Sequence, residues 1–134
     1  MNIICVKFGP KYGAEFVNKI YKDLHYPIDF YCYTDNADGL HKSIKIIPDM
    51  GRPTLKVWWN KLRMFDKNFP LSGKTLFLDL DVKVSAFPEH LNVSWNKITF
   101  IDCHWKQGKL YNRLSNYDVK MNSSMITWDA DNPE

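Results

Sequence analysis

The 134-residue sequence has only three cysteines and six glycines, and it contains no long apolar run. An odd number of widely spaced cysteines, without a Cys-x-x-Cys pair, argues against a disulfide framework and against a cysteine-based zinc site. No stretch reaches the roughly 18 apolar residues of a transmembrane helix. The first apolar segment is also too short and too polar at its edges for a signal peptide. We therefore expect a cytoplasmic protein with reduced thiols and no membrane span.

An excess of charge of one sign is also missing, since 18 basic and 15 acidic residues give a net charge of +3. A dedicated nucleic-acid-binding domain concentrates basic residues far more, so we expect no nucleic-acid partner. An anionic small molecule held at one local site stays compatible with this charge. The hydrophobic fraction of 45% and the aromatic fraction of 15% exclude an intrinsically disordered chain. The length fits one domain over residues 1–134.

Strand and helix patterns alternate along the chain. β-branched and aromatic runs predict strands over residues 2–8, 29–34, 43–47, 75–80, 98–101 and 121–128. Helical spacing of apolar residues predicts helices over 12–24 and 55–65, the second with Trp58 and Trp59 in its buried stripe. This alternation predicts an α/β fold with a mainly parallel central sheet and helices on its faces. Residues 3–8, 30–34 and 76–79 are the expected neighbouring parallel strands.

Two carboxylates follow the most strand-like segment, as Asp79 and Asp81 in the run Leu-Asp-Leu-Asp-Val. Alternate side chains of an extended chain share a face, so both carboxylates can point the same way. Ligands of α/β sheets bind outside the carboxyl ends of the strands, where this pair is expected. Two close carboxylates repel each other unless a proton or cation intervenes, which makes a divalent metal their natural partner. The alternative is a pair of surface acids at a strand end.

Four segments in a fixed order resemble the nucleotide-sugar-binding half of GT-A glycosyltransferases, particularly glycogenin-like and bacterial galactosyltransferase relatives. They are the first strand (IICVKF, 3–8), YTD (33–35), WWNKL followed by LFLDLD (58–62 and 76–81), and MNSSM (121–125). The resemblance covers nearly all of this chain but not all of the family's domain. It implies a Rossmann-like nucleotide-diphospho-sugar transferase fold that is short at its C-terminal end.

The resemblance also implies roles for the two aspartates and for the polar residues around them. Asp79 and Asp81 would match the metal-binding Asp-x-Asp motif, holding Mn²⁺ or Mg²⁺ against the donor diphosphate. Lys61 would reach the donor sugar or phosphate, and Asn122 and Ser123 would lie beside the donor sugar. The alternatives are a solvated lysine on a helix face and an ordinary strand with polar residues on one side.

The loop after the first strand corresponds to the family's base pocket. Phe8 and Tyr12 would pack on a nucleobase, and Asp35 would accept a hydrogen bond from the base or ribose. The alternatives here are core aromatic residues and a turn-forming aspartate. We assign no residue a catalytic role.

The acceptor side of the family's site has no counterpart in this sequence. The family's chain continues past the last matched strand and often supplies a third metal ligand there, commonly a histidine. The resemblance thus implies a metal-dependent domain that binds a nucleotide-diphosphate sugar, most simply a UDP-sugar, and transfers the sugar to a hydroxyl acceptor. A non-catalytic nucleotide-sugar-binding module is the alternative. We expect a homo-oligomer or a second chain to be able to complete the site.

Overall fold

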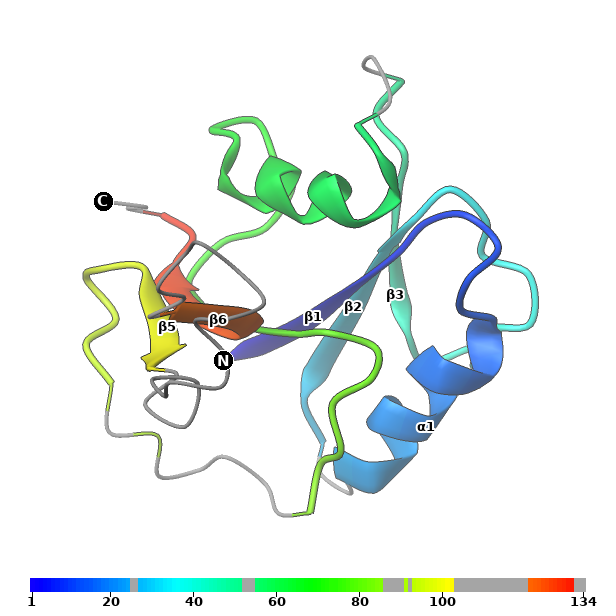
Figure 1. Ribbon diagram of the computed structural model, residues 1–134, viewed down its shortest axis with the longest axis horizontal. Coiled ribbons are helices and arrows are strands. Elements are labelled where there is room, and N and C mark those ends of the chain that lie inside the picture. The colour runs from blue at the N-terminus through cyan, green and yellow to red at the C-terminus, as the bar shows by residue number, and fades with distance from the viewer. Residues whose placement is uncertain (25–26, 52–54, 86–90, 92, 103–120, 132–134) are drawn as a thin grey trace, which may run out of the picture.

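A central six-stranded sheet organises the chain in the computed structural model (Figure 1). The structure describes residues 1–24, 27–51, 55–85, 91, 93–102 and 121–131. The strands are β1 (Asn2–Lys7), β2 (Asp29–Thr34), β3 (Lys45–Pro48), β4 (Lys74–Leu78), β5 (Thr99–Asp102) and β6 (Met121–Asp129). The helices are the α-helix α1 (Ala14–Leu24) and the 3₁₀ helix η1 (Val57–Phe65), drawn in green in Figure 1. In the described part of the chain, no helix has the length and apolarity that crossing a membrane requires.

The strand order is β3-β2-β1-β4-β6-β5. β1 pairs in parallel with β2 and β4, and β2 pairs in parallel with β3. This confirms the mainly parallel α/β sheet and the three neighbouring parallel strands. β6 runs antiparallel to both β4 and β5, with a register irregularity at Phe100 and Ile101. The carboxyl ends of β1, β2 and β4 therefore meet at one edge of the sheet, which is where a ligand of an α/β fold is expected.

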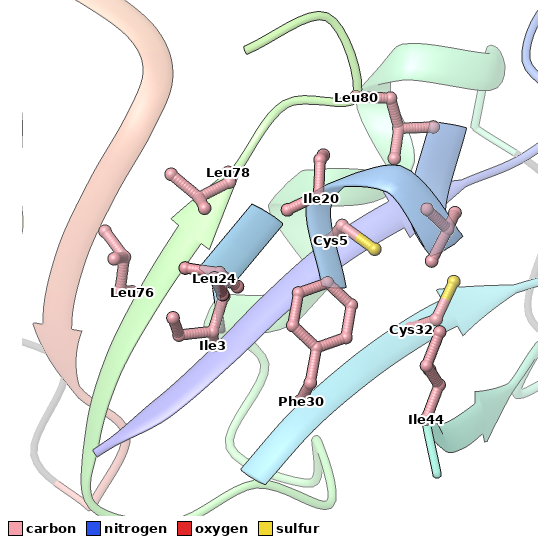
Figure 2. Packing of buried hydrophobic residues seen from close by; sticks show 11 residues of the cluster. Ile3, Cys5, Ile20, Leu24, Phe30, Cys32, Ile44, Leu76, Leu78 and Leu80 are labelled. Carbon is pink, nitrogen blue, oxygen red and sulfur yellow. The ribbon is translucent and has the colours of Figure 1, made fainter. Parts of the chain in front are cut away.

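One face of the sheet is closed by α1, whose Val17, Ile20 and Leu24 are buried at helical spacing. Figure 2 shows Ile20 and Leu24 beside residues of β1, β2 and β4, among them Phe30 of β2 and Leu76 of β4. The sulfurs of Cys5 and Cys32 belong to the same cluster, from opposite positions of β1 and β2 (Figure 2). Both are buried free cysteines, and burial raises the pKa of the Cys5 thiol.

The opposite face of the sheet is covered by η1 and the segment that follows it. Side chains alternate along a strand, so Ile4 points to this face while its neighbours in β1 point to α1. The cluster here is rich in aromatic residues, including Phe77 and the fully buried Trp128, and Met64 of η1 completes it. The fold thus has three layers, with α1 and η1 on opposite sides of the sheet (Figure 1).

The prediction of a buried stripe in the second helix is wrong. Trp58, Trp59 and Leu62 are 62%, 49% and 50% exposed, and the buried residues of η1 are Asn60 and Met64. The reason is the helix type, because a 3₁₀ helix has three residues per turn and aligns side chains three apart. The predicted stripe is then split into two rows, Leu55 with Trp58 and Trp59 with Leu62 and Phe65. Of these residues, Phe65 packs against the core, on Trp128. The first helix also begins at Ala14 rather than at residue 12.

Candidate functional site

A cavity of about 150 Å³ lies where the carboxyl ends of β1 and β4 meet η1. Three parts of the chain line it: the end of β1 with the following loop, the end of β4 with the following turn, and η1. The lining residues are Val6, Phe8, Lys11, Tyr12, Val57, Trp58, Lys61, Phe77, Asp79, Leu80 and Asp81. The two aspartates, Lys61, Phe8 and Tyr12 of the sequence-predicted site therefore share one cavity.

Asp79 is the first residue after β4, and its side chain is partly buried. Its backbone N–H donates to the carbonyl of Ser124 at 2.9 Å, which holds the strand end against β6. The Lys61 Nζ lies 3.5 Å from its Oδ2. Burial raises the pKa of the Asp79 carboxyl, Lys61 opposes this, and the neighbouring Asp81 charge adds to it. Burial therefore disfavours the ionised form of Asp79, even with Lys61 nearby.

Asp81 lies two residues further along and is exposed to solvent. The hydroxyl of Tyr12 donates to its Oδ2 at 3.4 Å, so the loop after β1 reaches the Asp-x-Asp pair directly. Lys11 lies over the Tyr12 ring, 4.8 Å from its centre. The Tyr12 hydroxyl, and more weakly both aspartates, raise the pKa of Lys11. The cavity lining therefore includes a second lysine, Lys11, in addition to Lys61 and the two carboxylates.

Lys61 connects η1 with β6. Its Nζ donates to the Ser123 Oγ at 2.8 Å and lies 5.5 Å from the centre of the Phe77 ring. The ammonium group is thus held between Asp79 and Ser123 rather than free in solvent, unlike the solvated-lysine alternative. The Asn122 side chain forms a hydrogen bond within its own strand, where its Oδ1 accepts from the Ser124 N–H at 2.6 Å. Neither Asn122 nor Ser123 lines the cavity, and Ser123 acts on it through Lys61.

Phe8 and Asp35, both predicted as site residues, also stabilise the local structure. Phe8 is buried and packs edge-on against Tyr33 with ring centres 4.8 Å apart, while still forming part of the cavity wall. Asp35 accepts from the Gly9 N–H at 3.0 Å, and this turn favours glycine at position 9 because the φ there is +70°. Asp35 lies in a neighbouring, more open hollow of about 410 Å³, which shares Tyr12 with the first cavity.

Six of the eleven lining residues are not among the site residues that the sequence predicts: Val6, Lys11, Val57, Trp58, Phe77 and Leu80. The sequence pattern assigns Trp58 to the core instead. Trp58 carries a usable signal, because it precedes Lys61 by three residues. That spacing places both side chains on one side of a 3₁₀ helix.

The carboxylates fit a divalent cation that prefers oxygen ligands, Mg²⁺ or Mn²⁺, because both line one cavity and their repulsion would be relieved by it. Within the described residues, no group of three His, Cys, Asp or Glu side chains is placed to hold a metal. Mg²⁺ characteristically keeps several waters and is bound through one or two carboxylates together with substrate phosphates. The two aspartates match that pattern.

No protein-family model and no curated protein matches this sequence. Among solved structures, an active-site mutant of LgtC, a glycosyltransferase, matches with a TM-score of 0.64 and 15% sequence identity. The match covers 97% of this chain and 57% of LgtC, so the chain spans a little over half the length of this structural neighbour. At this identity the likeness establishes the fold. The chain has a mixed α/β architecture of the glycosyltransferase GT-A type.

Proposed function

We propose that this chain binds a nucleotide-diphosphate sugar together with Mn²⁺ or Mg²⁺, as the donor-binding part of a glycosyltransferase. The observation that carries the proposal is the cavity itself. It combines Asp79 and Asp81 with the Lys61 ammonium and an aromatic wall at the carboxyl ends of parallel strands. A UDP-sugar is the most direct candidate, and the sugar would pass to a hydroxyl acceptor.

The chemistry of the cavity supports a diphosphate ligand. A divalent cation at the two carboxylates would neutralise the diphosphate as it becomes the leaving group. Lys61 is held by Ser123 and Asp79, so its positive charge is already oriented toward the site. Preorganised charge of this kind needs no rearrangement as negative charge develops on the leaving group. Phe8 and Tyr12 would provide the apolar surface for the nucleobase.

A non-catalytic nucleotide-sugar-binding module is the second candidate. One observation favours it: among the described residues, no three His, Cys, Asp or Glu side chains are grouped so that they could hold a metal. Holding an acceptor in line with the reacting carbon can be worth about 7–11 kcal/mol of the barrier. A homodimer or a second chain could supply that acceptor surface.

Titration calorimetry with UDP, with Mn²⁺ present and then removed by a chelator, tests donor binding. Asp81→Asn should weaken Mn²⁺-dependent UDP binding by at least ~1.5 kcal/mol, the lower value for a hydrogen bond to a charged group. Asp102→Asn removes an exposed carboxylate on the edge strand β5 and should leave binding unchanged. Equal binding by the native chain and Asp81→Asn would mean that the aspartate pair has no role in the site.

A turnover assay separates the enzyme from the binding module. The 134-residue chain is incubated with Mn²⁺, a panel of UDP-sugars and hydroxyl acceptors at concentrations where it is monomeric. We expect donor binding with slow or absent transfer. Rapid multiple-turnover transfer by the monomer would contradict the need for a second chain.

A further inference from the structure

Half of the exposed large apolar side chains in the described part of the structure are gathered in one short segment. Ten such residues are exposed, and five of them lie within residues 55–62: Leu55, Val57, Trp58, Trp59 and Leu62. Exposed apolar patches mark ligand grooves, protein interfaces or membrane-contact surfaces. Trp58 belongs to the cavity, but Trp59 and Leu62 do not line it. The proposed donor site therefore leaves these two residues unexplained.

The 3₁₀ geometry of η1 separates two rows of side chains. Residues three apart share a side, so Trp58 and Lys61 form the row that faces the cavity. Trp59 and Leu62 form a second row and are both exposed, whereas Phe65, the next residue of that row, packs against Trp128. Lys56, which precedes the helix, and Lys67, which follows it, are also exposed. We call the exposed residues Lys56, Trp59, Leu62 and Lys67 the outer ridge of η1. In Figure 1, η1 lies on the outside of the molecule, beyond the sheet.

The charge of the chain is concentrated in the same place. Residues 55–67 contain four basic residues and one acidic residue, a net charge of +3, which equals that of the whole chain. The remaining residues carry fourteen charges of each sign. Within this segment, Lys61 turns toward Asp79, whereas Lys56 and Lys67 are exposed. The outer ridge thus combines tryptophan and leucine with two exposed lysines.

From this combination we infer that the outer ridge of η1 docks on an anionic lipid surface. Tryptophan is enriched at membrane–water interfaces, and interfacial helices pair apolar residues with lysine. Each lysine near an anionic membrane contributes attraction that corresponds to about fivefold in partitioning. Protein interfaces, in contrast, are depleted in lysine relative to the rest of the surface. The lysines therefore favour lipid over a protein partner as the occupant.

Docking in this way would also orient the cavity. Val57 and Trp58 line the cavity from the same helix, so docking of η1 would fix the orientation of the cavity relative to the lipid surface. The inference itself does not depend on donor binding, because Trp59, Leu62, Lys56 and Lys67 all lie outside the cavity lining.

The test is co-sedimentation of the full 134-residue chain with vesicles. One set is phosphatidylcholine alone, and the other is an equimolar mixture of phosphatidylcholine and phosphatidylglycerol. We expect at least about tenfold stronger partitioning to the anionic vesicles, falling with added salt because charge attraction is screened. Trp59→Ser with Leu62→Ser, and separately Lys56→Glu with Lys67→Glu, should each lower it about tenfold or more. Circular dichroism checks that each variant is folded.

Matched controls remove the same kinds of side chain elsewhere. Phe100→Ser with Met121→Ser removes exposed apolar residues on β5 and β6, and Lys42→Glu with Lys97→Glu reverses two exposed charges. Both controls should stay within about twofold of the native chain. Equal losses in ridge and control variants, or no preference of the native chain for anionic vesicles, would overturn the inference. Concentration-dependent dimerisation that is lost in Trp59→Ser, without vesicle binding, would instead identify a protein interface.

Discussion

The two helices that flank the sheet differ in how far their apolar side chains are buried. α1 buries Val17, Ile20 and Leu24 against the strands, whereas η1 exposes Trp58, Trp59 and Leu62 and buries Asn60. The Asn60 amide is satisfied inside its own segment, donating to the carbonyls of Leu55 and Val57 at 3.2 Å each. The difference indicates a division of labour, in which α1 stabilises the fold and η1 contributes mainly to the candidate site and to the surface.

The largest expected effect lies in the α1 layer. Ile20→Ala deletes a side chain that is 2% exposed and should lower the free energy of unfolding by about 2–5 kcal/mol, because transfer and cavity costs add. Urea unfolding measures it, and UDP binding by the folded fraction should not change. A loss below about 1 kcal/mol would mean that α1 does not belong to the cooperative core.

A smaller effect is expected at the contact between η1 and β6. Ser123→Ala removes the hydroxyl that accepts from Lys61 Nζ at 2.8 Å, while the Asp79 contact remains. We expect Mn²⁺-dependent UDP binding to weaken by about 1 kcal/mol, the typical net value of one hydrogen bond. Titration calorimetry checks it, with the exposed Ser72→Ala as control. If both variants bind alike, Lys61 does not depend on Ser123 for its position.

Because the pKa of the Asp79 carboxyl is raised, we expect the folding stability of the chain to depend on pH. Burial, and to a lesser extent the Asp81 charge, raise its pKa in the folded state above the ordinary value, despite Lys61. Between the ordinary and the raised pKa the folded chain holds a proton that the unfolded chain has released, so stability falls as pH rises through this window. Asp79→Asn cannot ionise and should escape this loss.

Metal-free urea unfolding from acidic to neutral pH measures this difference. The stability of Asp79→Asn relative to the native chain should rise with pH through the window and then level off. Asp131→Asn, at an exposed position, should follow the native chain. A native chain that gains stability relative to Asp79→Asn as pH rises would show that Lys61 outweighs burial.

The smallest expected effect lies on the outer ridge. Leu62→Ala should change the free energy of unfolding by no more than about 0.5 kcal/mol, because the side chain is half exposed. The same urea titration compares it directly with Ile20→Ala. A decrease in the free energy of unfolding of more than about 2 kcal/mol would mean that Leu62 contributes to stability as a core residue of α1 does.

Most of the fold could be predicted from local patterns. Each of the six strands is found close to its expected range, and the α1 pattern of Val17, Ile20 and Leu24 holds in the structure. These elements are amphipathic or continuously apolar, so burial and local preference agree. In η1, burial and local preference disagree, because the apolar spacing fits an α-helix whereas the segment adopts 3₁₀ geometry. Cys103, one of the three cysteines, lies outside the described residues.

The candidate site could be predicted only in part. Asp79 and Asp81 are neighbours in sequence, and the end of a strand places them at the cavity. The links from Tyr12 to Asp81 and from Lys61 to Ser123 join residues 69 and 62 positions apart. No local pattern encodes such pairs. Asp35 shows the same limit, because its carboxylate supports the Gly9 turn beside the cavity instead of lining it.

The sequence by itself determined the α/β class, the parallel strands and the position of two carboxylates at a strand end. The class and the strands follow from the alternation of apolar runs, which acts over a few residues. Asp79 and Asp81 follow β4 in a turn, closed by the Val82 N–H donating to the Asp79 carbonyl at 3.2 Å, and not in the extended chain that the sequence predicts. Only the tertiary structure decided which side of η1 faces the cavity, where Lys61 is held, and that the outer ridge meets solvent. Those features depend on how η1 packs against β6 and the end of β1. That packing is a balance of contacts between distant segments, which local spacing does not record.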